Sequence, residues 1–142
     1  MTVAMRLGPA DPSYPTRLFG QIVIPPTATI EFPDGIPGFP DARQFAQLAA
    51  STPALSWLQS LDEPALAFLL VEWPAVAEPL DADGADSYAV VTLPGANRPA
   101  TANLQAPILI DRTRRRGRQA IRTDAAPGTA VPIDLEALIR LS

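Results

Sequence analysis

Proline is the sequence feature that most restricts the fold of this 142-residue chain. Seventeen prolines are spread along it, and a proline inside a helix costs about 3 kcal/mol and removes a backbone hydrogen-bond donor. Few windows are therefore long enough for a regular helix, whereas short strands joined by turns tolerate proline. The sequence predicts an all-β fold: a small β-barrel-like single domain with one or two short helices.

The hydrophobic pattern places the expected elements. Alternating or continuous apolar runs predict strands at residues 17–24, 27–32, 55–61, 65–72, 87–93, 101–111 and 119–122. The apolar residues of the segment 41–50 fit both the helical spacing of three residues and the strand alternation of two. We expect a short helical turn that runs into a strand. Leu135, Leu138 and Ile139 stand at helical spacing after Asp134, a candidate N-cap, so a short helix is predicted near the end of the chain.

The chain is predicted to consist of a tail and one domain. Residues 1–16 contain Pro9, Pro12 and Pro15 where a secretory signal would need an unbroken apolar run, so we expect a flexible N-terminal tail without a signal. Residues 17–142 are expected to form the barrel domain. The most apolar run, residues 65–71, is much shorter than the roughly 18 residues that span a bilayer, so no membrane association is expected.

Histidine and cysteine are both absent. The chain therefore lacks the commonest metal ligand, the usual general base and any thiolate nucleophile, and we expect no enzyme activity, no cofactor and no metal. The adjacent pair Asp62 and Glu63 is the first acid–base candidate, but neighbouring turn residues point apart, which favours a solvated turn. Asp81, Asp83 and Asp86 lack the spacing of a calcium loop. The lack of cysteine fits a cytoplasmic location.

The formal net charge of −4 favours a basic partner over nucleic acid. Residues 112–118 hold five arginines, which leave open an RNA-binding alternative, but no aromatic residues are interleaved for base stacking. We therefore expect no direct nucleic-acid partner. Trp73, beside Pro74 at a strand end, is the large aromatic residue most expected to be exposed.

Four stretches, taken in order, resemble elements of the FliW family. They are IEFPDGIPGF at residues 30–39 (family pattern I-x-F-x-x-G-I-P-G-F), WLQSLDEPALAF at residues 57–68 (L-Q-S-x-x-x-P-x-L-A-F), YAVVTL at residues 88–93, and TANLQAPILI at residues 101–110 (T-A-N-L-x-A-P-I-x-I), followed by Gly117-Arg118-Gln119. Each stretch alone is weak evidence for the family, but the four together, in the same order, make a specific match. Residues 73–86 depart from it, since they are short and proline-rich where the family usually has a longer acidic insert with a helix.

The resemblance implies a cytoplasmic, β-barrel-like protein that binds flagellin and also binds the translational repressor CsrA. By holding CsrA away from flagellin mRNA, such a protein couples flagellin translation to filament assembly. A second alternative, besides RNA binding, is a β-barrel protein-binding adaptor without a regulatory role.

The polar residues of the matched stretches are the candidate partner surface. Because polar groups beside buried strands must face solvent or a ligand, we expect Gln59, Asp62, Glu63, Asn103 and Gln105 to be exposed there and to form or border that surface. Turn and cap chemistry is the competing interpretation. Asn103 in particular could satisfy backbone groups next to Pro107.

Overall fold

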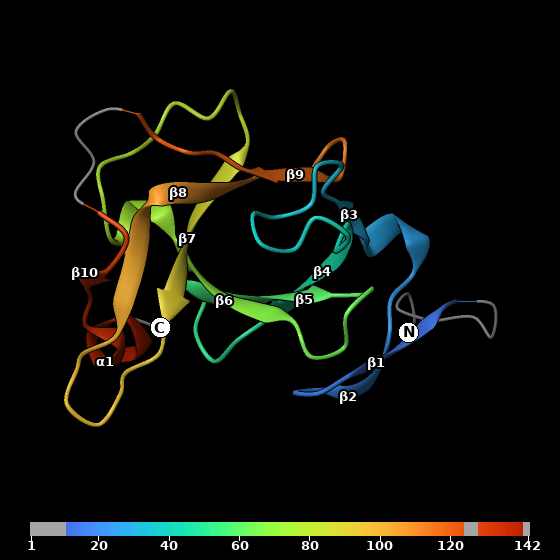
Figure 1. Ribbon diagram of the computed structural model, residues 1–142, viewed down its shortest axis with the longest axis horizontal. Coiled ribbons are helices and arrows are strands. Elements are labelled where there is room, and N and C mark those ends of the chain that lie inside the picture. Colours follow the sequence, from blue (N-terminus) through green and yellow to red (C-terminus); the bar gives the residue numbers. More distant parts are fainter. Residues whose placement is uncertain (1–10, 124–127, 141–142) are drawn as a thin grey trace, which may run out of the picture.

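The structure is a computed structural model that describes residues 11–123 and 128–140. Within these residues, seven strands close into a barrel (Figure 1). They are β3 (Ile30–Glu31), β4 (Gln44–Ala49), β5 (Leu55–Ser60), β6 (Ala67–Glu72), β7 (Asp86–Thr92), β8 (Thr101–Asp111) and β9 (Arg116–Gln119). The ring closes because β9 pairs with both β8 and β3, and the β3–β9 pair is parallel while the other neighbours are antiparallel. The predicted all-β barrel is confirmed.

The remaining elements lie outside this ring. β1 (Ser13–Thr16) and β2 (Gly20–Val23) form a hairpin beside the barrel, and β10 (Val131–Pro132) extends the sheet beyond β8. Two short 3-10 turns, η1 (Pro26–Ala28) and η2 (Trp73–Ala75), and the helix α1 (Leu135–Arg140) complete the described chain. Residues 13–16, predicted as tail, are strand because they pair with β2, whereas residues 1–10 lie outside the described residues.

Four other predicted segments are wrong in detail. Residues 17–19 form the turn between β1 and β2, so β2 is shorter than the predicted strand 17–24. Of the predicted strand 27–32 only Ile30–Glu31 is strand, because η1 occupies residues 26–28.

Residues 41–50 contain no helix. A single turn, closed by the Ala42 N–H on the Phe39 carbonyl at 3.2 Å, leads into β4, so the predicted strand is found and the turn before it is shorter than expected. The last barrel strand is β9 and not residues 119–122. A tight turn after β8, with Arg115 in the left-handed region (φ 54°), starts that strand earlier than the apolar pattern indicates.

The barrel interior holds the first core. Phe32, Phe45, Leu58, Leu70 and Ile108 are fully buried there, and the rings of Phe32 and Phe45 meet edge to face at 5.0 Å. Such aromatic packing combines a large buried apolar area with favourable ring geometry. The inward faces of the strands therefore fill the barrel with side chains and not with solvent.

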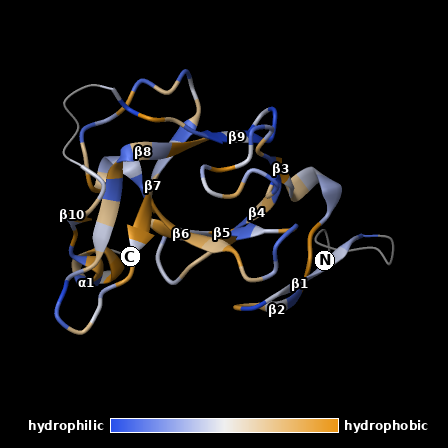
Figure 2. Cartoon of the chain, in the orientation of Figure 1, coloured by the Kyte–Doolittle hydropathy of each residue, from blue (hydrophilic) through white to orange (hydrophobic). Residues whose placement is uncertain are grey.

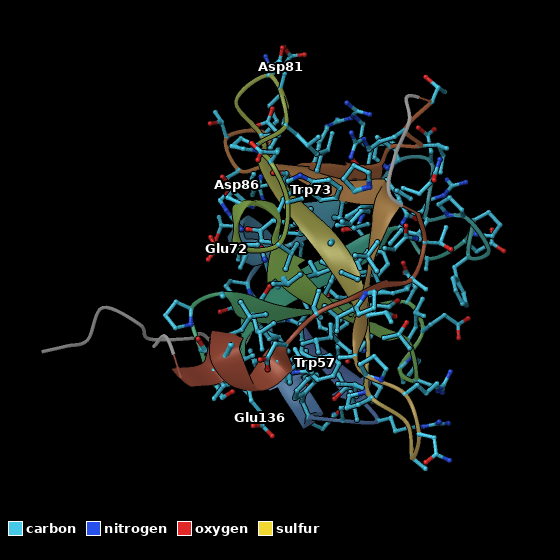
Figure 3. All side chains as sticks on the ribbon, turned by 90° about the vertical axis from the view of Figure 1, so that its left-hand side faces the viewer. Trp57, Glu72, Trp73, Asp81, Asp86 and Glu136 are labelled. Atoms are coloured by element: carbon cyan, nitrogen blue, oxygen red, sulfur yellow. The ribbon has the colours of Figure 1, made fainter. Side chains whose placement is uncertain are left out.

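A second core lies on the outer face of the sheet. There α1 places Leu138 over apolar side chains from β5 to β8, including Val71 and Ala102. Trp73 is fully buried in this cluster, and its Nε1–H donates to the Glu78 carbonyl at 2.8 Å (Figure 3). The expected exposure of Trp73 is therefore wrong, because η2 folds the indole back onto the sheet.

Strand β8 follows the predicted bounds, residues 101–111, but it contains a wide bulge. Tyr88 of β7 faces Ile108, and Val90 faces Asn103, so residues 104–107 lie opposite Ala89 alone. Pro107 lies in this bulge, where its missing N–H costs no ladder hydrogen bond.

Candidate functional site

The turn between β5 and β6 contains three of the predicted site residues. Gln59 is fully buried, so its predicted exposure is wrong. Its Nε2 donates to the carbonyls of Ser60, Pro64 and Leu66 at 2.9, 3.3 and 3.1 Å. Its Oε1 has no hydrogen-bond partner among the described residues. The folded-back turn encloses this amide, which holds the turn in place.

Asp62 and Glu63 are both exposed but differ in their contacts. The Asp62 carboxylate accepts the backbone N–H groups of Arg43 and Gln44, each at 2.8 Å, and so ties the β5–β6 turn to the start of β4. Glu63 uses only its backbone, which donates to Ser60 Oγ at 2.9 Å. Within the described chain, the Glu63 carboxylate has no ion pair or hydrogen bond and remains open to a partner.

Asn103 and Gln105 stabilise the bulge of β8. Asn103 Oδ1 accepts the N–H groups of Gln105 and Ala106 at 2.9 and 3.2 Å, and Gln105 Nε2 donates to the Arg122 carbonyl at 2.9 Å. Both side chains are half-buried. β6 and β7 lie between β5 and β8 in the sheet, so the structure divides the five predicted residues into two groups.

Phe39 is an exposed aromatic residue that the polar pattern does not identify. It is 44% exposed and meets the Phe68 ring edge to face at 6.1 Å. The Pro37–Gly38 turn precedes it directly, but the sequence gives no separate signal for its exposure, since Ile36, which follows Gly35 in the same loop, is buried. The β3–β4 loop and the β5–β6 turn form the same end of the barrel, which we call the signature end; it carries Phe39, Asp62 and Glu63.

The opposite end of the barrel has a hollow of about 510 Å³, lined among others by Gln47, Ser56, Glu72, Tyr88 and Arg112. Arg112 Nε donates to Asp86 Oδ2 at 2.6 Å, and its Nη2 donates to Gln47 and Tyr88. Burial alone would lower the pKa of Arg112, but the hydrogen bonds to Asp86 and Tyr88 outweigh it and raise the pKa. Figure 3 shows Glu72 and Asp86 along one side of the molecule.

The arginines of the β8–β9 turn have partners of their own. The Arg114 N–H donates to Asp111, whose other oxygen accepts from the Arg114 side chain at 3.1 Å. The backbone donor is the main cause that lowers the pKa of the Asp111 carboxyl below its ordinary value. Arg115 donates to the Pro26 carbonyl, and Arg116 lies 3.8 Å from the Glu31 carboxylate.

The acidic loop before β7 has no cluster of ligands. Asp81 accepts the N–H of Asp83, while Asp86 pairs with Arg112. Within the two described ranges, no group of three or more Asp, Glu, His or Cys side chains could hold a metal ion. A helix long and apolar enough to cross a membrane is likewise not found among them.

Comparison with known proteins gives one consistent family. The model of the FliW protein family matches residues 13–133. The flagellar assembly factor FliW of Moorella thermoacetica is 42% identical, covering 75% of this chain and 78% of that protein, and the one of Treponema denticola is 34% identical, covering 77% and 84%. A crystal structure of the flagellar assembly factor FliW superposes with a TM-score of 0.73 at 30% identity, covering 88% of this chain and 99% of the other. The chain therefore belongs to the FliW family.

Proposed function

We propose that this protein is a flagellar assembly factor that binds flagellin and antagonises the translational repressor CsrA in the cytoplasm. The observation that carries the proposal is the family match over residues 13–133, supported by relatives named flagellar assembly factor. Binding to CsrA would free flagellin mRNA for translation, and free flagellin would compete for the same protein. The chain would act through its folded surface, since it has neither histidine nor cysteine.

The signature end is our proposed partner surface. Phe39 offers an exposed aromatic ring, and the Glu63 carboxylate has no partner in the described chain. Aromatic residues are enriched in protein interfaces, and an unpaired charge at the rim of an interface selects a partner of the opposite charge. Asp62 borders this surface, whereas Gln59 lies beneath it and acts through the turn that it holds.

Charge reversal at Glu63 tests this surface. The Glu63→Lys variant should keep its fold and weaken binding to flagellin or to CsrA by about tenfold, because an unpaired carboxylate becomes a like charge for a basic partner. Glu78→Lys, an exposed site on the loop after η2, is the matched control. Titration calorimetry measures both affinities. Unchanged affinity for both partners in Glu63→Lys would remove the signature end from the interface.

The RNA-binding alternative has less support from the geometry. Arg112, Arg114 and Arg116 pair with carboxylates, and Arg115 donates to a carbonyl, so most of the cluster is engaged within the chain. Salt-dependent RNA binding that disappears when Arg114, Arg115 and Arg116 are replaced would favour this alternative. An adaptor without a regulatory role would bind flagellin and leave CsrA unbound.

A further inference from the structure

Arg118 differs from the other arginines that follow β8. The side chains of β9 alternate, and Gly117 faces inward so closely that a Cβ there would lie 2.4 Å from the Phe32 ring. Arg118 therefore points outward, opposite Leu109 in the ladder, on a strand that is strongly hydrophilic in Figure 2. Its guanidinium has no ion pair or hydrogen bond to any described residue, although Arg112, Arg114, Arg115 and Arg116 all have partners.

Two hollows meet at this arginine. One, of about 340 Å³, has apolar lining from Pro33, Ala82 and Leu109 and charged lining that includes Asp83, Asp111, Arg114 and Arg116. The other, of about 400 Å³, lies along the β3–β4 loop and includes Ile36 and Pro37. Both are lined by Arg118 and by Asp34, and Figure 1 shows the loop after β3 beside β9.

Asp34 and Arg118 border both hollows without forming an ion pair, since their charged groups are more than 4.0 Å apart. The Asp34 carboxylate likewise has no partner in the described part of the chain. An extended peptide between them could place a carboxylate on the guanidinium and donate a backbone N–H to Asp34. A nucleic-acid backbone has no N–H group for Asp34 to accept, whereas a peptide backbone does, so the pair favours a polypeptide over nucleic acid.

We propose that Arg118 and Asp34 clamp an extended polypeptide segment that carries an Asp or Glu side chain next to an aliphatic one. The acidic side chain binds Arg118, and the aliphatic side chain enters the hollow over Leu109. The site is preorganised: Gly35 has φ +67°, and a Cβ there would lie 2.6 Å from the Pro40 carbonyl oxygen, so the loop has one close-packed path. This proposal shares one assumption with the proposed function, namely that the ligand is a protein.

Nuclear magnetic resonance on the full chain tests the clamp. The probe is the blocked peptide acetyl-Ala-Leu-Glu-Leu-Ala-amide, compared with the same peptide carrying Gln or Lys in place of Glu. The Glu peptide should shift the Nε–Hε signal of Arg118 and the backbone N–H signal of Gly117 in a saturable way. The Gln peptide should bind about tenfold more weakly, because it lacks the charge-assisted hydrogen bonds.

Three variants complete the test. Arg118→Ala should lose the response, while Arg98→Ala, which removes an exposed guanidinium from the β7–β8 loop, should keep it. Arg118→Glu should prefer the Lys peptide, which shows that the altered surface is still folded. Equal binding of the Glu and Gln peptides, a response that survives Arg118→Ala, or tighter binding of oligouridylate to the same signals would overturn the clamp. Flagellin binding measured on the same sample separates this failure from failure of the proposed function.

Discussion

Polar residues in the matched stretches mainly organise the backbone. The Gln59 side chain donates hydrogen bonds to three backbone carbonyls, and the Asp62 carboxylate accepts two backbone N–H groups. Asn103 accepts two more N–H groups within the bulge of β8. The cap interpretation of Asn103 is confirmed, because Asn side chains often satisfy nearby backbone groups. Burial of Gln59 could not be predicted, since it depends on how the β5–β6 turn folds back over its own strand. Exposure of Glu63 follows from its turn position.

Asn103 provides a stability test at this scale. We expect Asn103→Ala to lower the free energy of unfolding by about 1–2 kcal/mol, because two partly buried N–H groups lose their acceptor. Asn97→Ala is the matched control: Asn97 is exposed on the β7–β8 loop, and its replacement should change stability by less than about 0.5 kcal/mol. Urea denaturation measures both. Equal effects of the two replacements would show that the bulge does not depend on its cap.

At the scale of elements, alternation and turn signals predict strands whose partners are adjacent in sequence. β5, β6, β7 and β8 follow the predicted ranges to within two residues at either end. The predictions fail where long-range contacts decide. β9 begins at Arg116 because it pairs with β3, which is distant in sequence, as well as with β8. A local pattern contains no information about the β3–β9 pairing, whereas the β1–β2 hairpin is local and is missed because the prolines near residue 13 indicate a tail.

The inward glycine of β9 is the first element-scale prediction. Gly117→Ala should destabilise the protein by about 1–3 kcal/mol, since its Cβ would overlap the Phe32 ring in the filled barrel. In Gly95→Ala the new Cβ meets only the flexible Arg98 side chain, which can move away. We therefore expect this control to differ from the parent by less than about 0.5 kcal/mol in thermal unfolding. A tolerated Gly117→Ala would mean that β9 can shift relative to the interior.

The terminal helix α1 gives the second element-scale prediction. Leu138 is buried against the outer core, whereas its neighbour Ile139 is 45% exposed. Leu138→Ala should cost about 2–3 kcal/mol of unfolding free energy, while Ile139→Ala should cost less than about 0.5 kcal/mol. Chemical denaturation of the two variants gives the comparison. Similar values would indicate that α1 does not pack on the sheet in solution.

For the whole molecule, the closed ring leaves most strand edges paired, so partners must be recognised mainly by side chains and loops. The sequence predicts the all-β barrel because prolines and alternation both exclude long helices. It does not predict which loops share an end of the barrel. The signature end and the Arg118 clamp arise only when segments distant in sequence are brought together by the closure of the barrel.

Binding to the two proposed partners is the most direct test of the central claim that this fold acts by holding other proteins. Purified chain is titrated with monomeric flagellin and, separately, with CsrA by calorimetry, and flagellin is then added to the preformed CsrA complex. The account predicts binding to each protein at micromolar concentration or below, and release of CsrA as flagellin binds. Absence of binding to both proteins at these concentrations would contradict it.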